Sequence, residues 1–130
     1  RTTVREPKLC EQVIETGKPV YISLGMWEHE WLPFENSNVK YFNCISKYPT
    51  SIMDFKKFSY DERIVGFSDH SYGVAYALYN VAHGAQVVEK HFTLNKGMEG
   101  NDHIGSMDLG ELKILREYGK QFSNISKAIK

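Results

Sequence analysis

The feature that most constrains the fold is a pattern that occurs four times: a short run of β-branched or aromatic residues leads into small or polar residues. These runs lie in residues 18–26, 39–50, 63–70 and 85–94. Each has the length of a strand and lacks a clean polar face, which is typical of parallel strands covered on both sides. Residues 74–83 carry apolar residues at helical spacing and end before Gly84. The sequence therefore predicts a β-α-β unit within a parallel α/β sheet.

The remaining segments predict further helices. Residues 5–16 and 108–129 have amphipathic patterns, and the second places Leu112, Leu115, Tyr118 and Phe122 on one side. Residues 27–38 and 51–62 have poorer patterns, and we expect short or broken helices there. A chain of 130 residues with 42% hydrophobic content is large enough for one packed domain.

Composition and charge exclude several classes of function. Sixteen basic and sixteen acidic residues give a formal net charge of zero, so no overall field favours nucleic acid or an anionic membrane. No apolar run has the length of a membrane-spanning helix, and no signal-peptide pattern begins the chain. The two cysteines have no C-x-x-C spacing, which indicates free thiols in a reducing compartment. We therefore expect a cytoplasmic protein that binds neither nucleic acid nor membranes.

Polar residues follow each predicted strand, and parallel α/β sheets bind ligands at the carboxyl ends of their strands. Residues two apart on a strand face the same side, as do Ser68 and His70, and Glu89 and His91. If the third and fourth strands are neighbours, about 4.8 Å apart, both imidazoles can reach one metal ion. The residues expected at this rim are Ser23, Ser46, Ser68, His70, Glu89 and His91.

Simpler interpretations compete with each of these assignments. Two histidines separated by 21 residues are by themselves a weak metal signal. The serines could be small residues at tight turns, although three hydroxyls at one rim favour an anion site. Tyr48 could belong only to a turn before Pro49, or it could offer its hydroxyl to a substrate. Lys90 is out of phase with Glu89 and His91, so we expect it to point away from the rim.

Four motifs, CISKYPT, VGFSDHSYG, GAQVVEKHFTL and NDHIGSMDLGELK, in this order and at these intervals, strongly resemble the sialic acid synthase family. With TGKPVYISLGM, the resemblance covers the chain from about Thr16 to Leu115. It implies that residues 1–130 form the second half of a (β/α)8 TIM-type barrel, strands five to eight. On this resemblance, we expect these residues to lack the first four strands and the family's C-terminal antifreeze-like domain. The chain starts at Arg1 without an initiating Met, and we expect it to be part of a longer or processed protein.

The same resemblance implies a reaction and a set of roles. The family condenses phosphoenolpyruvate with an N-acetylated mannosamine, releases phosphate and uses a divalent ion, commonly Mn²⁺, with Mg²⁺ or Co²⁺ as alternatives. His70 and His91 match the two protein ligands of that ion. Ser23, Ser46 and Ser68 match positions that contact phosphoenolpyruvate. Tyr48, Glu89 and Asp102 match positions that orient the sugar or take part in catalysis.

This sequence departs from the family pattern at Leu24, where Thr is usual, and at Ser46, where several members carry Asn. The segment between Gly25 and Val39 is also short. These departures leave the acceptor sugar open, with legionaminate or pseudaminate synthesis as alternatives. A different class of function also stays open, in which the half barrel is a non-catalytic assembly or binding module. Because half a barrel has two unpaired sheet edges, we expect a homodimer.

Overall fold

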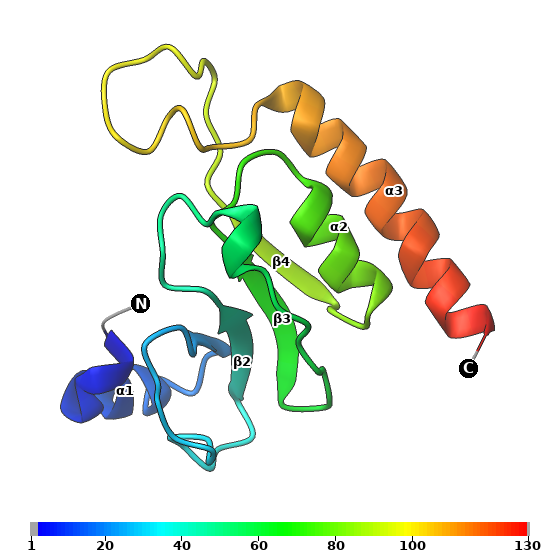
Figure 1. The fold of residues 1–130 in the computed structure, drawn as a ribbon. Helices are drawn as coiled ribbons and strands as arrows, with labels where there is room; N and C mark the ends of the chain where they lie inside the picture. Colours follow the sequence, from blue (N-terminus) through cyan, green and yellow to red (C-terminus); the bar gives the residue numbers. More distant parts are fainter. Residues whose placement is uncertain (1–2, 130) are drawn as a thin grey trace.

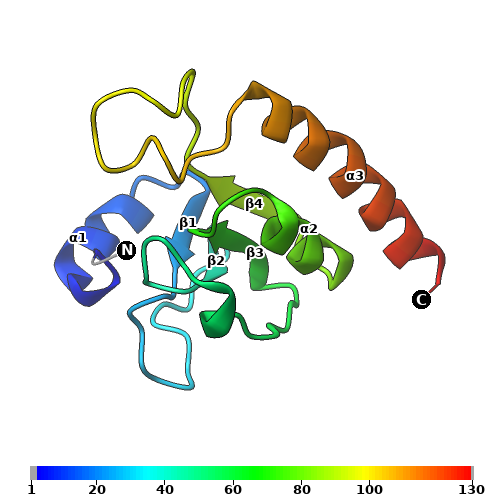
Figure 2. The ribbon, with the colours of Figure 1, turned by 45° about the horizontal axis from the view of Figure 1, so that its top comes forward.

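The computed structural model describes residues 3–129 and forms a four-stranded parallel sheet with the strand order β1-β2-β3-β4. The strands span Val20–Ser23 (β1), Val39–Cys44 (β2), Ile64–Asp69 (β3) and Val87–Lys90 (β4). Figure 2 shows them side by side, with β1 on the side of α1 and with β3 and β4 on the side of α2. Because every neighbouring pair is parallel, the segments that follow the strands all lie at one end of the sheet. The predicted parallel α/β sheet is confirmed.

The helices occupy the positions that the sequence predicts, with shorter bounds. They are α1 (Pro7–Ile14), α2 (Ala75–Ala82) and α3 (Leu109–Ala128), and a 3₁₀ turn, η1 (Thr3–Arg5), precedes α1. Helix α2 packs on β3 and β4, and α3 packs along α2 on the side away from the sheet (Figure 1). The Asp108 side chain accepts from the backbone N–H of Glu111, and the Glu111 side chain caps Asp108 in return, so α3 begins there.

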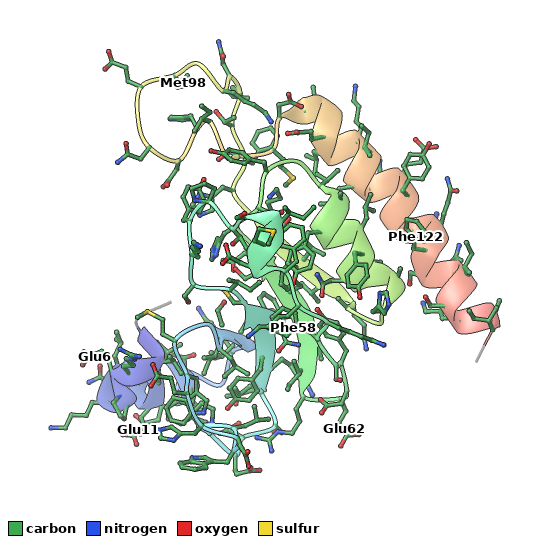
Figure 3. All side chains as sticks on the ribbon, in the orientation of Figure 1. Glu6, Glu11, Phe58, Glu62, Met98 and Phe122 are labelled. Carbon is green, nitrogen blue, oxygen red and sulfur yellow. The ribbon has the colours of Figure 1, made fainter. Side chains whose placement is uncertain are left out.

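The apolar stripe predicted on α3 is only partly covered. Leu112 and Leu115 are partly buried, whereas Tyr118 is 47% and Phe122 36% exposed. Figure 3 labels Phe122 on α3, the outermost helix. Only the side of α3 that meets α2 is therefore shielded within the described residues.

The pairing of β2 with β3 contains a shift in register. Tyr41 pairs with Ile64, but the next residue, Phe42, pairs with Gly66, so β3 contributes one extra residue at Val65. Ile64 packs against the buried cluster of Val4, Ile22, Val39 and Tyr41. Because side chains alternate along a strand, the extra residue turns the following part of β3 over. Gly66, Ser68 and His70 therefore face the opposite side of the sheet from Ile64.

The expectation of short or broken helices in residues 27–38 is wrong, since this segment has no helix in the structure. Pro33 disfavours helical geometry at the residue before it. The Tyr41 hydroxyl donates to the Phe34 carbonyl at 2.8 Å and accepts from the Phe34 N–H at 2.9 Å, which occupies groups that a helix would use. The segment is instead held by packing, because Trp27, Leu32 and Phe34 contact the cluster around Tyr41.

In residues 51–62 the structure has a single 3₁₀ turn, η2 (Ile52–Asp54). Ser51 caps it by accepting from the backbone N–H of Met53 at 3.3 Å, while Asp54 accepts from the N–H of Ser51 at 3.1 Å. The prediction of short or broken helices is thus confirmed for this segment, which contains one 3₁₀ turn of three residues. In the part of the chain that the structure describes, no helix combines the length and the apolar content needed to cross a membrane.

We predict that alanine has opposite effects at two glycines. At Gly66 an added Cβ would lie 2.6 Å from the Phe42 ring and 2.7 Å from the Val87 carbonyl oxygen, which is backbone and cannot move aside cheaply. Gly66→Ala should lower the free energy of unfolding by about 1–3 kcal/mol. Gly119 lies within α3, and its nearest neighbour would be 4.0 Å away at Leu78.

Gly119→Ala should therefore raise the free energy of unfolding by about 0.5–1 kcal/mol, since alanine restricts the unfolded chain and favours the helix. Urea denaturation followed by circular dichroism measures both changes. Equal effects of the two substitutions would show that the close approach at Gly66 is relieved without cost.

Candidate functional site

A cavity of about 550 Å³ lies at the carboxyl end of the sheet. All of the residues predicted at this rim line it, with the exception of Ser46, and Cys44 and Asn101 join them. The lining residues are Ser23, Cys44, Tyr48, Ser68, His70, Glu89, His91, Asn101 and Asp102. The structure thus brings together side chains from all four strand ends and from the loop that precedes α3.

The strands place these side chains by register. Ser68 on β3 pairs with Cys44 on β2 and with Glu89 on β4, so the three side chains share one face of the sheet. His70 and His91 follow Ser68 and Glu89 by two residues and keep the same phase. The two histidines therefore lie directly beyond a row of polar side chains, with ring centroids 6.1 Å apart.

His70 is oriented by hydrogen bonds at both its ring and its backbone. Its Nδ1 atom lies 3.0 Å from the Ile45 carbonyl oxygen, which can only accept a hydrogen bond. We therefore assign the proton to Nδ1, which leaves the lone pair on Nε2. The His70 carbonyl accepts from the backbone N–H of Thr50 at 2.9 Å. These contacts fix both the tautomer and the direction of the imidazole.

Tyr48 lies between the histidines and a loop residue, Asp102. Its ring centroid is 5.7 Å from that of His70 and 5.2 Å from that of His91. Its hydroxyl donates to the Asp102 backbone carbonyl at 2.9 Å. Burial raises the pKa of the Tyr48 phenol, and the negative charge of Asp102 raises this pKa further. The phenol is therefore protonated at neutral pH, and its one proton is donated to the Asp102 carbonyl.

Asp102 reaches the cavity from a long loop that projects beyond the sheet. This loop occupies residues 94–106, and Figure 3 shows Met98 on it, far from the strands. The Asp102 carbonyl accepts from both Tyr48 and the Ser106 hydroxyl, the latter at 2.6 Å. The Asp102 carboxylate lies 3.8 Å from Nδ1 of His91, within ion-pair range but beyond a hydrogen bond.

The other end of the loop is held to the segment after β4. Phe92 and Met107 form a parallel bridge, and the Met107 N–H donates to the His91 carbonyl at 2.9 Å. The Thr93 hydroxyl lies 2.8 Å from Nδ1 of His103. His91 is thus fixed through its backbone, as His70 is.

The donor set is suited to a divalent metal ion with two protein ligands. Both imidazoles line the cavity, and His70 presents a ring nitrogen with a free lone pair. Neutral imidazole binds divalent transition metals well, and Mn²⁺, Mg²⁺ and Co²⁺ also accept oxygen ligands. Within residues 3–129 there is no group of three or more His, Cys, Asp or Glu side chains that could hold a metal. A metal here would therefore keep several positions open.

Ser46 takes a different place from the other predicted residues. Its Oγ atom is buried without a hydrogen-bond partner and lies against Gly25, where an added Cβ would come within 2.3 Å of it. The proposed role of Ser46 in binding phosphoenolpyruvate remains a prediction. Lys90 lies on the opposite face of the sheet from His91 and bonds with Asp69, as its phase predicts.

Two lining residues were not predicted from the sequence. Cys44 could have been found from its phase, because it is the last residue of β2 and stands two residues before Ser46. Its Sγ atom is 3.7 Å from Nδ1 of His70. Asn101 had no signal beyond its position next to Asp102, because the path of the loop decides which of its side chains reach the cavity.

Known proteins resemble this chain over most of its length. An uncharacterised protein of Methanocaldococcus jannaschii is 42% identical over 119 residues, covering 81% of this chain and 35% of that protein. A pseudaminic acid synthase of Campylobacter jejuni is 34% identical over 126 residues, covering 84% of this chain and 36% of that protein. The chain thus spans about a third of the length of these curated relatives.

The fold also matches a solved structure, the N-acetylneuraminic acid (sialic acid) synthetase of Leptospira borgpetersenii in complex with citrate. The TM-score is 0.77 at 24% identity, and the match covers 95% of this chain and 48% of that chain. This likeness identifies the sheet and its helices as a parallel-strand half-barrel α/β fold. The model of the NeuB family matches residues 2–130. The chain therefore belongs to the NeuB family, as the sialic acid synthase motifs of the sequence predict.

Proposed function

We propose that this chain forms strands five to eight of the barrel of a sialic acid synthase-like transferase. In this proposal its cavity binds phosphoenolpyruvate and an N-acetylated mannosamine-type sugar, which are condensed to a nonulosonic acid with release of phosphate. The observation that carries the proposal is the convergence of two imidazoles, two carboxylates, a phenol and two serine hydroxyls on one cavity. The residues with proposed roles are Ser23, Ser68, Tyr48, His70, Glu89, His91 and Asp102.

Ser23 and Ser68 are suited to hold the phosphate or carboxylate of phosphoenolpyruvate. Ser68 is 4% exposed and lines the cavity, so a hydrogen bond from its hydroxyl to an anion would be shielded from water. None of the described residues that line the cavity is Lys or Arg. The positive charge that an anion needs would come from the metal ion and from other parts of the barrel.

His70 and His91 would hold the divalent ion, which we propose to be Mn²⁺, with Mg²⁺ or Co²⁺ as alternatives. When bound, such an ion polarises a carbonyl oxygen as a Lewis acid. Tyr48 would accept a hydrogen bond from a sugar hydroxyl, because its own proton is donated to the Asp102 carbonyl. The carboxylates of Glu89 and Asp102 would accept hydrogen bonds from sugar hydroxyls or from water and so orient the reacting aldehyde.

The direct test is a phosphate-release assay on the complete protein with phosphoenolpyruvate, Mn²⁺ and N-acetylmannosamine. Parallel reactions with the sugars that lead to legionaminate and pseudaminate decide between the branches of the family, because only the matching sugar should give rapid release. The absence of sugar-dependent phosphate release with all three would reject the synthase proposal.

A non-catalytic assembly module is the second candidate, and the open sheet favours it. Among the described residues, β1 pairs only with β2, and β4 pairs only with β3. A rotation by half a turn about the barrel axis would set β4 of one copy beside β1 of another with all strands parallel. A homodimer of half barrels is therefore a geometrically consistent product of this chain.

We predict that His70→Ala and His91→Ala each abolish metal-dependent turnover, because a single imidazole would remain as protein ligand. His83→Ala is the matched control, since His83 is exposed at the end of α2, outside the cavity. Turnover after chelation and readdition of Mn²⁺ measures the effect. Full activity of both histidine variants would refute the metal assignment.

Ser68→Ala should raise the KM for phosphoenolpyruvate about tenfold or more. A hydrogen bond to a charged group contributes about 1.5–3 kcal/mol, and each 1.4 kcal/mol corresponds to a factor of about ten in affinity. Ser37→Ala, at an exposed loop position, should leave the KM unchanged. If Ser68→Ala raises only the KM for the sugar, Ser68 contacts the sugar and not the anion.

The isolated 130-residue chain should self-associate at micromolar concentration and should not catalyse the condensation. The unpaired edges of β1 and β4 favour association, because they expose backbone hydrogen-bonding groups. Sedimentation velocity measures the first expectation, and the phosphate-release assay the second. A stable monomer would contradict the first, and metal-dependent phosphate release would contradict the second.

A further inference from the structure

We propose that the buried ion pair of Asp69 and Lys90 is a positioning device that sets the separation of His70 and His91. The inference rests on the proposed function, in which these two imidazoles bind one divalent ion. It concerns the opposite face of the sheet from the cavity and assigns a role to two residues that do not touch the substrates.

The pair is fully buried, and both of its members make further hydrogen bonds to Ser71. The Lys90 Nζ atom is 3.1 Å from Oδ2 of Asp69, and the two side chains are 1% and 0% exposed, respectively. The ammonium also donates to the Ser71 carbonyl at 2.6 Å. The other carboxylate oxygen of Asp69 accepts from the Ser71 N–H at 2.9 Å and from the Ser71 hydroxyl at 2.7 Å.

The position of the pair in the sequence links it to both histidines. Asp69 and Ser71 stand on either side of His70, and Lys90 immediately precedes His91. Asp69 and Lys90 are register partners, so their side chains share the face opposite the imidazoles. The ion pair therefore crosslinks the ends of β3 and β4 directly behind the two proposed ligands.

The backbone hydrogen bonds of the two histidines do not join β3 to β4, although the Tyr48 ring lies beside both imidazoles. The Thr50 N–H holds the His70 carbonyl, and the Met107 N–H holds the His91 carbonyl. Each contact fixes one histidine relative to its own surroundings, and neither joins β3 to β4. Among the described residues, the side chain of Lys90 joins the end of β4 to both Asp69 and Ser71 by hydrogen bonds.

Stability alone is a poor reason to bury this pair. Removing two ions from water costs free energy, and well-packed apolar residues often give equal or greater stability. The two acceptors of the Lys90 ammonium, however, hold β4 at one position relative to β3. Apolar contacts have no fixed direction, so they would allow the two strand ends to shift. Groups behind metal ligands commonly change metal affinity by about 10–100-fold when they are removed.

The test is a titration of the complete protein with Mn²⁺ alone, followed by the electron paramagnetic resonance signal of the free ion. The variants are Lys90→Met, the double variant Asp69→Asn with Lys90→Met, and Lys90→Arg, which keeps the charge. Lys40→Met is the matched control, because Lys40 is also a strand lysine that donates to a backbone carbonyl, that of Glu62, at the opposite end of the sheet. Thermal unfolding identifies the folded variants.

We expect Mn²⁺ to bind about 10–100-fold more weakly to Lys90→Met and to the double variant. Lys90→Arg should restore part of the affinity, and Lys40→Met should bind like the wild type. The double variant keeps the test valid if Lys90→Met fails to fold, because it leaves no unpaired buried ion. Wild-type affinity of a folded double variant would overturn the proposal.

Failure of the proposed function gives a different result. In that case the wild type would not bind Mn²⁺, or His70→Ala and His91→Ala would bind it unchanged, and both proposals would fall together. If the double variant does not fold while Lys40→Met does, the pair is a requirement for folding and the positioning role is rejected.

Discussion

The phase of the side chains along β3 is the constraint on which the rest of the site depends. Ile64 must face the buried cluster around Tyr41, whereas Ser68 and His70 must face the cavity. A regular strand would place all three on one side, because they are separated by even numbers of residues. The extra residue at Val65 resolves this conflict, and Gly66 follows it where the Phe42 ring and the Val87 carbonyl leave no room for a side chain.

Much of this arrangement could be predicted from the sequence, because strand ends and side-chain alternation are local properties. The four strands, their parallel order and the phase of Glu89 with His91 follow from short runs of residues. The shift at Val65 could not be predicted, since it depends on which residues of β2 lie beside β3. The same holds for residues 27–38, where the hydroxyl of Tyr41, from the next strand, takes the place of helical hydrogen bonds.

The candidate site also contains residues that the sequence predicts and residues that it does not. Seven of its predicted residues line the cavity, because six of them follow from strand phase or from the turn after β2 and Asp102 from the family motif. Ser46 has the correct phase but lies beyond the end of β2, where its hydroxyl turns toward Gly25. Asn101 lies in a loop whose path depends on two partners of the Asp102 carbonyl, the nearby Ser106 and the distant Tyr48. Such partners leave no periodic signal in a sequence.

The two faces of the sheet differ in how their polar side chains are paired and exposed. On the helix-covered face, charge is neutralised within the protein, because Lys90 is bonded to Asp69 and Ser71. On the cavity face, the polar groups remain partly exposed, with the His91 side chain 43% and the Asp102 side chain 67% accessible. A charged group that is already paired within the protein makes the strand ends more rigid but cannot bind a ligand. An exposed polar group can bind a ligand but needs other residues to fix its position. The alternation of a β-strand places these two kinds of group one residue apart, so that each proposed metal ligand is positioned from behind by the residue before it.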